Sequence, residues 1–215
     1  MRGFFITFEG NEGSGKTTQI ATLARRLQDG GREVVVLREP GGTPIGEEIR
    51  HILKHSPNNA AMTWKAELLL MNASRAQLVG EIIEPALLAG KVVVCDRFYD
   101  STLVYQGYGR QLDPVTVRAV IEVAVGKIVP DVTFLLRVST KTSYERRNFR
   151  NQTQSAVRDR MEEADAGFFD RVEKGYEALA QEEKCRVVTI DGEADPATVA
   201  ERIWNEAQKR FQAGF

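Results

Sequence analysis

The sequence is poor in cysteine, in histidine and in net charge, and each scarcity excludes a class of protein. Its two cysteines, Cys95 and Cys185, are far apart and lack metal-ligand spacing, so we expect free thiols in a reducing compartment. The two histidines, His51 and His55, stand one helical turn apart and favour a helix surface over a metal pair. With 29 basic and 30 acidic residues, the chain has no overall positive field to attract nucleic acid or an anionic membrane. The partners are therefore expected to be small molecules.

Long hydrophobic runs are also missing. The first apolar run ends at Glu9, too early for the hydrophobic part of a signal peptide or for a membrane-spanning helix. This absence predicts a soluble, cytoplasmic protein. The 215 residues, 42% of them hydrophobic, suffice for one sizeable core, and no linker, repeat or low-complexity tract interrupts them. We therefore expect a single domain over residues 1–215.

Short apolar runs alternate with helix-periodic segments along the chain. The runs are rich in β-branched residues and too short for helices, as in buried parallel strands, and they cover 4–8, 34–37, 92–95, 132–138 and 187–190. The helix-periodic segments cover 17–28, 45–54, 64–88, 114–125, 140–149, 166–180 and 196–212. This alternation predicts an α/β fold with a doubly wound, five-stranded parallel sheet flanked by helices. Ligands of such sheets bind at the carboxyl ends of the strands.

The most specific motif follows the first apolar run and opens the first helix. It matches the pattern G-x-x-x-x-G-K-[ST] and consists of Gly10, Asn11, Glu12, Gly13, Ser14, Gly15, Lys16 and Thr17. Its glycines let successive N–H groups point at an anion, the helix adds the positive end of its dipole, and Lys16 adds a mobile cation. Thr17 supplies a hydroxyl suited to Mg²⁺. The motif predicts that the chain binds a nucleoside triphosphate.

The segment 146–160 is polar, lacks an apolar stripe, and carries five arginines with one acidic residue. Those arginines are Arg146, Arg147, Arg150, Arg158 and Arg160. A solvated helix face is one interpretation of such a charge run. Beside a phosphate loop we favour a short mobile lid, because the planar donor fork of arginine suits phosphoryl oxygens and closure would exclude water.

Two of the predicted strands end in residues that suit phosphate chemistry. After the second strand, Pro40 excludes a helix at Glu39. The glycines of the segment 38–43 let the backbone approach a ligand, but a plain turn without a ligand is an equally good interpretation of this segment. After the third strand, Asp96 could hold Mg²⁺ through water and Arg97 could neutralise phosphates. The alternative for Asp96 and Arg97 is a structural ion pair.

Two further groups of residues are ambiguous without other information. Met71 and Arg75 share one helix face, which fits either a pair that recognises a base or a core methionine beside a surface arginine. The segment 105–110 contains aromatic and amide side chains but is, by itself, only a glycine-rich loop.

Taken together, the motifs closely resemble the thymidylate kinase family. The matching stretches span nearly the whole chain and are Phe8-Glu9-Gly10 through Gln19, Arg38 through Thr43, Ser74-Arg75-Ala76-Gln77, Asp96-Arg97-Phe98, Ser101, Tyr105-Gln106-Gly107 and Asp159-Arg160-Met161-Glu162. The resemblance implies a P-loop nucleoside monophosphate kinase fold and transfer of the γ-phosphoryl group of ATP to thymidine monophosphate (dTMP). It also implies use of Mg²⁺ and a homodimer.

The resemblance also implies roles for single residues. Glu12 would contact the sugar 3′-hydroxyl, Arg97 would bridge the acceptor and transferred phosphates, and Tyr105 would disfavour a ribose 2′-hydroxyl. Arg75 would hydrogen-bond the thymine edge. The dTMP site would comprise Glu12, Glu39, Pro40, Met71, Arg75, Arg97, Ser101, Tyr105 and Gln106. The ATP site would comprise Gly10, Asn11, Glu12, Gly13, Ser14, Gly15, Lys16, Thr17, Thr18, Arg146 and Arg160; Lys16, Arg97, Arg147 and Arg150 would be catalytic, and Thr17 and Asp96 would hold the metal.

Two positions refine this resemblance. Gly13 stands where one branch of the family carries a loop arginine, and the branch with glycine here has arginines in its lid instead. Met71 replaces a phenylalanine that usually stacks on thymine, so the aromatic stack is lost while a thioether contact remains. A kinase of another nucleotide or nucleoside is therefore an alternative. A second alternative is an ATP-dependent switch protein, against which stands the lack of an Asn-Lys-x-Asp motif.

Overall fold

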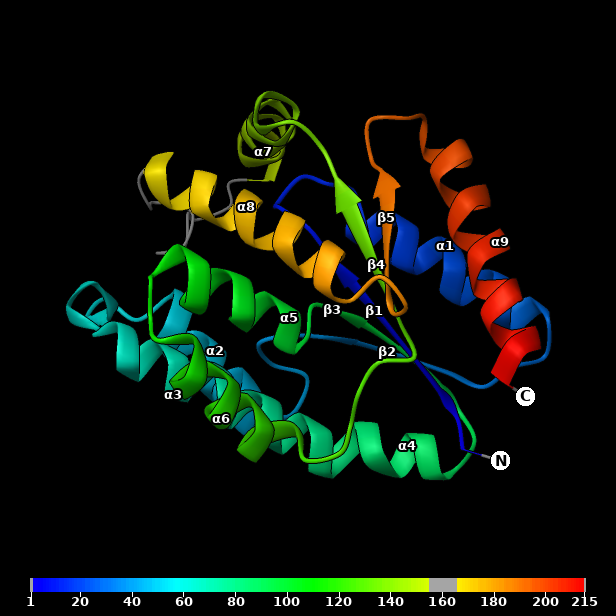
Figure 1. Cartoon of the computed structure of the whole chain (residues 1–215), viewed down its shortest axis with the longest axis horizontal. Helices are drawn as coiled ribbons and strands as arrows, with labels where there is room; N and C mark the ends of the chain where they lie inside the picture. The colour runs from blue at the N-terminus through cyan, green and yellow to red at the C-terminus, as the bar shows by residue number, and fades with distance from the viewer. Residues whose placement is uncertain (1, 155–165, 215) are drawn as a thin grey trace.

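A computed structural model describes residues 2–154 and 166–214 and contains one five-stranded parallel sheet. The strands are β1 (Phe4–Glu9), β2 (Val34–Arg38), β3 (Val92–Asp96), β4 (Val132–Arg137) and β5 (Val187–Asp191), in the order β2-β3-β1-β4-β5 (Figure 1). All five lie where the apolar runs predicted them. β1 is central, with Phe8 opposite both Asp96 of β3 and Phe134 of β4, so its carboxyl end meets the ends of both neighbours.

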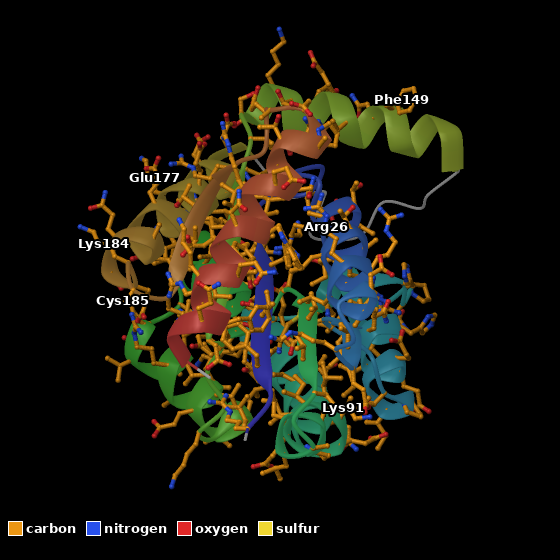
Figure 2. All side chains as sticks on the ribbon, turned by 90° about the vertical axis from the view of Figure 1, so that its right-hand side faces the viewer. Arg26, Lys91, Phe149, Glu177, Lys184 and Cys185 are labelled. Atoms are coloured by element: carbon orange, nitrogen blue, oxygen red, sulfur yellow. The ribbon has the colours of Figure 1, made fainter. Side chains whose placement is uncertain are left out.

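Helices cover both faces of the sheet. They are α1 (Lys16–Asp29), α2 (Pro44–Lys54), α3 (Trp64–Leu78), α4 (Glu84–Leu88), α5 (Tyr99–Thr102), α6 (Pro114–Val125), α7 (Thr140–Gln154), α8 (Ala166–Glu182) and α9 (Pro196–Gly214), with the short helical turns η1 (Asn59–Ala61), η2 (Val79–Ile83) and η3 (Leu103–Gly109). One apolar core lies between the sheet and α1 and α9, which face the viewer in Figure 2, and a second lies between the sheet and α3, α4 and α6. A third cluster joins α8 and η3 to β4.

The helix predicted over 64–88 is continuous but contains a π-helical turn, η2, between α3 and α4. Pro85 explains this turn, because a proline lacks the N–H group for the helical ladder and its ring clashes with the carbonyl four residues earlier. A wider turn just before the proline accommodates both effects.

Two segments differ from their expected form. Residues 105–109, which alone suggested a loop, belong to the π-helical turn η3. A Cβ atom on Gly109 would lie 2.5 Å from the ring of Phe168, so this glycine permits close packing of α8 on η3. The helix predicted over 140–149 continues to Gln154, so the segment expected to be a lid begins as helix, and its remainder, 155–160, lies outside the described residues. In the described part of the chain, no helix is long and apolar enough to cross a membrane.

Candidate active site

The phosphate loop connects β1 to α1 and is shaped by its glycines. Gly10, Gly13 and Gly15 have positive φ angles of 129°, 74° and 96°, a region that side chains with a Cβ rarely adopt. The loop curls around the side chain of Lys16, whose Nζ donates to the carbonyl oxygens of Gly10 and Asn11, each at 3.0 Å. Burial, helped by the charge of Arg97, lowers the pKa of Lys16 to about 8. An anion in the loop would favour the charged form again.

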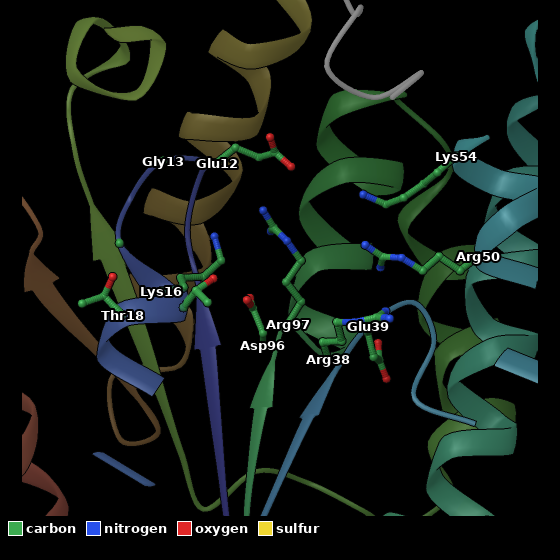
Figure 3. A pocket seen from close by; sticks show the side chains of 12 residues that line it. Glu12, Gly13, Lys16, Thr18, Arg38, Glu39, Arg50, Lys54, Asp96 and Arg97 are labelled. Atoms are coloured by element: carbon green, nitrogen blue, oxygen red, sulfur yellow. The ribbon is translucent and has the colours of Figure 1, made fainter. Parts of the chain in front are cut away.

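A cleft of about 310 Å³ opens beside this loop at the carboxyl ends of β1, β2 and β3 (Figure 3). Its lining residues are Glu12, Gly13, Gly15, Lys16, Thr17, Thr18, Arg38, Glu39, Arg50, Lys54, Asp96 and Arg97. Figure 3 shows Lys16 on one side, Arg50 and Lys54 on the other, and Arg97 between them. Cations that converge from separate elements make this cleft suited to an anionic ligand with more than one phosphate group.

Arg50 and Lys54 are functional candidates that the motifs did not identify. They are spaced i, i+4 on α2, so they share one face of that helix. The side chain of Thr43 accepts a hydrogen bond from Gly46 N at 3.0 Å and begins the helix directly after the glycine turn. The signal in the sequence was therefore a capped basic helix face following the segment 38–43.

Arg97 projects into the cleft from a constrained backbone. Its φ angle is 71°, and its N–H donates to Phe8 O at 2.9 Å, which fixes the turn to the end of β1. Nη1 donates to Ser101 Oγ at 3.0 Å and Tyr176 OH at 3.1 Å. Nη2 donates to Tyr105 OH at 3.4 Å. Arg97 is thus held by hydroxyl groups from three elements, and its ion-pair partner is Glu9, at 3.8 Å, rather than Asp96.

Arg75 is buried, so the alternative of a surface arginine beside a core methionine is wrong. Its side chain is 2% exposed. The guanidinium contacts Glu39 Oε2 through Nε at 2.8 Å and Nη2 at 2.7 Å. The remaining donors go to Asn72 Oδ1 and Thr102 Oγ1 from Nη1, and to the carbonyl oxygen of Phe98 from Nη2. Every donor of Arg75 has an acceptor, so recognition of a base edge requires one of these bonds to be shared.

Gln106 is also buried and has a fixed orientation. Its Nε2 donates to Glu67 Oε1 at 2.9 Å, and Glu67 also pairs with Arg110 at 3.3 Å. Arg110 lies over the rings of Trp64 and Phe168, 4.0 and 4.5 Å from their centroids. These contacts tie α3, η3 and α8 together, and Met71 on α3 is partly buried.

On the other side of the phosphate loop, α7 contacts the loop backbone. Ser143 Oγ donates to Glu12 O at 2.7 Å, and Arg146 Nη1 donates to the carbonyl oxygens of Gly13 and Gly192, each at 3.2 Å. A second hollow of about 260 Å³ lies here, lined by Ser14, Gly15, Thr18, Gln19, Arg146, Gly192, Ala194, Pro196 and Val199. The side chains of Arg147 and Arg150, and all of Arg160, lie outside the described residues.

The chain is a nucleotide-binding protein with the P-loop nucleoside monophosphate kinase fold. Three features define this class: the phosphate loop at the end of the central strand, the strand order β2-β3-β1-β4-β5, and the cation-lined cleft. The family model for thymidylate kinase matches residues 8–203. The chain is 46% identical to the thymidylate kinase of Geobacter sulfurreducens over 213 residues, covering 97% of this chain and 100% of that one. It is 40% identical to that of an Exiguobacterium species, covering 100% and 98%.

A solved structure gives the same result. The crystal structure of thymidylate kinase from Ehrlichia chaffeensis superposes with a TM-score of 0.76 at 31% identity, covering 96% of this chain and 99% of that one. The chain therefore belongs to the thymidylate kinase family.

Proposed function

We propose that the protein transfers the γ-phosphoryl group of ATP to dTMP and releases ADP and dTDP. The observation that carries the proposal is the placement of Lys16 and Arg97 beside one cleft, with further cations across it. Such in-line transfer needs positioning and charge stabilisation rather than covalent chemistry. The acceptor is an ionised phosphate, so no general base is required of the protein.

Each side of the cleft has one role in this proposal. The donor side comprises the phosphate loop, α7 and the residues from Gly192 to Val199; the loop N–H groups and Lys16 bind the triphosphate, and the hollow beside Arg146 takes the adenosine. The acceptor side comprises α2, α3, η3 and Arg97; Arg50, Lys54 and Arg97 bind the acceptor phosphate, and Arg97 also reaches the transferred phosphoryl group. Arg75, Met71, Gln106, Ser101 and Tyr105 surround the thymidine, with Glu12 at the sugar.

The residues of the cleft also suit Mg²⁺. Thr17 and Asp96 line it together, and both carry oxygen ligands. Mg²⁺ commonly takes one or two protein ligands and completes its shell with phosphates and water, so a cluster of acidic residues is not needed. When bound, the ion would neutralise charge on the transferred phosphoryl group.

The proposal includes the overall organisation. The single domain would span residues 1–215, with lid arginines within 146–160 contributing to the transferred phosphate, in the manner of the family branch that has glycine at the position of Gly13. The protein would act in the cytoplasm as a homodimer. Exposed apolar side chains on the adjacent helices α2 and α3, namely Ile45, Ile52 and Leu69, support a contact between subunits.

An acceptor panel tests the proposal. ADP production from ATP and Mg²⁺ would be measured with dTMP, dUMP, UMP, CMP, AMP and GMP, with thymidine, and without acceptor. We expect a strong preference for dTMP. Lys16→Met should lower kcat by about 100-fold or more, because the donor phosphates lose their cation. The control Lys91→Met, at the opposite end of the sheet (Figure 2), should keep wild-type activity. ADP release that does not depend on an acceptor would refute the kinase.

A further inference from the structure

One buried carboxylate has no part in the function proposed above. Glu9 is the last residue of β1 and is 0% exposed. Its Oε1 accepts hydrogen bonds from the backbone N–H groups of Phe98 at 2.9 Å and Ser101 at 3.2 Å. Its Oε2 accepts from Ser101 Oγ at 2.6 Å and from Tyr176 OH at 2.9 Å. Four donors from α5, α8 and the turn after β3 thus converge on one side chain.

Two of these donors, the hydroxyl groups of Ser101 and Tyr176, are among the three hydroxyl groups that hold Arg97. A hydroxyl has one proton to donate and lone pairs to accept with. Because Ser101 and Tyr176 donate their protons to Glu9, their lone pairs face the N–H groups of Arg97, at 3.0 and 3.1 Å. The carboxyl group therefore sets the direction of both hydroxyl groups, and its Oε2 lies 3.8 Å from Nη1 of Arg97.

We propose that Glu9 is a positioning residue, which holds the guanidinium of Arg97 at the transferred phosphoryl group through the hydroxyl groups of Ser101 and Tyr176. This inference rests on the function proposed above. Arg97 has a φ angle of 71°, and a residue in this region persists only where the surrounding contacts over-determine it. Glu9 itself is fully buried and does not line the cleft, so it supplies such contacts without meeting the substrates.

Glu9→Gln tests the hydrogen-bond direction with almost no change of shape. If the amide oxygen keeps the two backbone N–H groups, the amide nitrogen must donate to both hydroxyl groups. Each hydroxyl proton then points at an N–H group of Arg97, which repels it. We expect kcat to fall by about 10- to 100-fold, since a displacement of about 1 Å has effects of this size.

The same substitution in an Arg97→Met background separates positioning from a general structural role. If Glu9 acts through Arg97, Glu9→Gln should change kcat by less than about twofold once the arginine is absent. Tyr176→Phe removes one of the two hydroxyl links and keeps the ring, so it should give a smaller loss of kcat and also lose its effect in the Arg97→Met background. If Glu9→Gln does not fold, Tyr176→Phe in the two backgrounds tests the positioning role instead.

Asp131→Asn is the matched control. Asp131 directly precedes β4 and accepts a hydrogen bond from Phe5 N at 2.7 Å, so the same chemical change is made beside β1 but at the end of that strand opposite the cleft. Its kcat should stay within about twofold of wild type.

The outcomes distinguish the two proposals. If Arg97→Met lowers kcat but Glu9→Gln does not, the role of Glu9 is refuted and the kinase stands. Equal losses for Glu9→Gln in both backgrounds would also refute positioning. If Arg97→Met itself keeps wild-type kcat, the assignment of Arg97 fails, and the role of Glu9 fails with it.

Discussion

Arg75 on the acceptor side is 2% exposed and has an acceptor for every donor, whereas Arg146 on the donor side is exposed and binds backbone carbonyl oxygens of Gly13 and Gly192. The acceptor side is linked by buried side-chain pairs, Arg75 with Glu39 and Arg110 with Glu67. Buried networks of paired side chains are rigid, while exposed bonds to backbone carbonyl groups exchange readily with water. The difference implies that the acceptor site exists before its ligand arrives, and that the donor side completes its arrangement on binding.

The largest expected effect is the difference between the contributions of Arg75 and Arg146 to the free energy of unfolding. Arg75→Met should lower the free energy of unfolding by about 3–5 kcal/mol, because Glu39 and the other buried acceptors of Arg75 are left without their donor. Arg146→Met should cost less than about 0.5 kcal/mol, as for other exposed substitutions. Urea denaturation of both variants measures the difference. Glu39→Gln added to Arg75→Met should recover part of the loss, and equal costs for the two arginines would contradict a pre-formed acceptor side.

A smaller effect tests the contact of α7 with the phosphate loop. A Cβ atom on Gly13 would lie 2.9 Å from Ser143 O and 3.2 Å from Arg146 Cβ, whereas one on Gly31 would have no atom within 4 Å. Both glycines have positive φ, 74° and 81°, so alanine at either position should cost about 1–2 kcal/mol of stability. Gly13→Ala alone should also displace α7 and raise KM for ATP by roughly tenfold. Steady-state kinetics of both variants would decide, and unchanged KM in Gly13→Ala would show that the contact is not needed for ATP binding.

The strands and the phosphate loop could be predicted from the sequence, whereas the form of residues 105–109 could not. The five strands followed from apolar runs: β1, β3 and β4 are buried along almost their whole length, as such runs predict, whereas β2 and β5 at the sheet edges are apolar but partly exposed. The phosphate loop followed from glycines and a lysine that are adjacent in the chain. Residues 105–109 by themselves suggest a loop, because a single sequence does not distinguish a glycine of a loop from one that serves close packing, here of Gly109 against Phe168.

The burial of Arg75 could not be predicted from the sequence for a related reason. Its partners Glu39 and Thr102 are 36 and 27 residues away, and Tyr176 is 79 residues from Arg97. The pattern of a helix gives the face on which a side chain lies but not what packs against that face. The sheet brings the ends of β2 and β3 together, and the residues that follow these two strands enclose the polar face of α3 that carries Arg75.

The smallest expected effect is a difference in how the two sides respond to pH. Burial raises the pKa of Glu39 to about 7 against the charge of Arg75, and among the described residues its Oε1 has no hydrogen-bond donor. On the donor side, Glu193 is exposed, and the hydrogen bond that it accepts from Ser139 N at 2.7 Å lowers its pKa. The two carboxyl groups should therefore affect stability with opposite sign.

Between the ordinary pKa of glutamate and about 7, the folded protein keeps a proton on Glu39 that the unfolded chain has released. Glu39 should therefore make stability fall as pH rises through this interval, by at most about 1.4 kcal/mol per pH unit, and Glu39→Gln should remove this part of the slope while leaving any part from Glu9, whose pKa burial also raises. Glu193 stabilises the folded protein at pH values above the ordinary pKa of glutamate, and this stabilisation is lost as pH falls below that pKa. Glu193→Gln should therefore change the dependence of stability on pH only in acid. Urea denaturation from about pH 4 to about pH 8 measures both. A wild-type slope in Glu39→Gln would mean that Arg75 keeps Glu39 ionised throughout, and the acceptor side would then be held by a permanent ion pair.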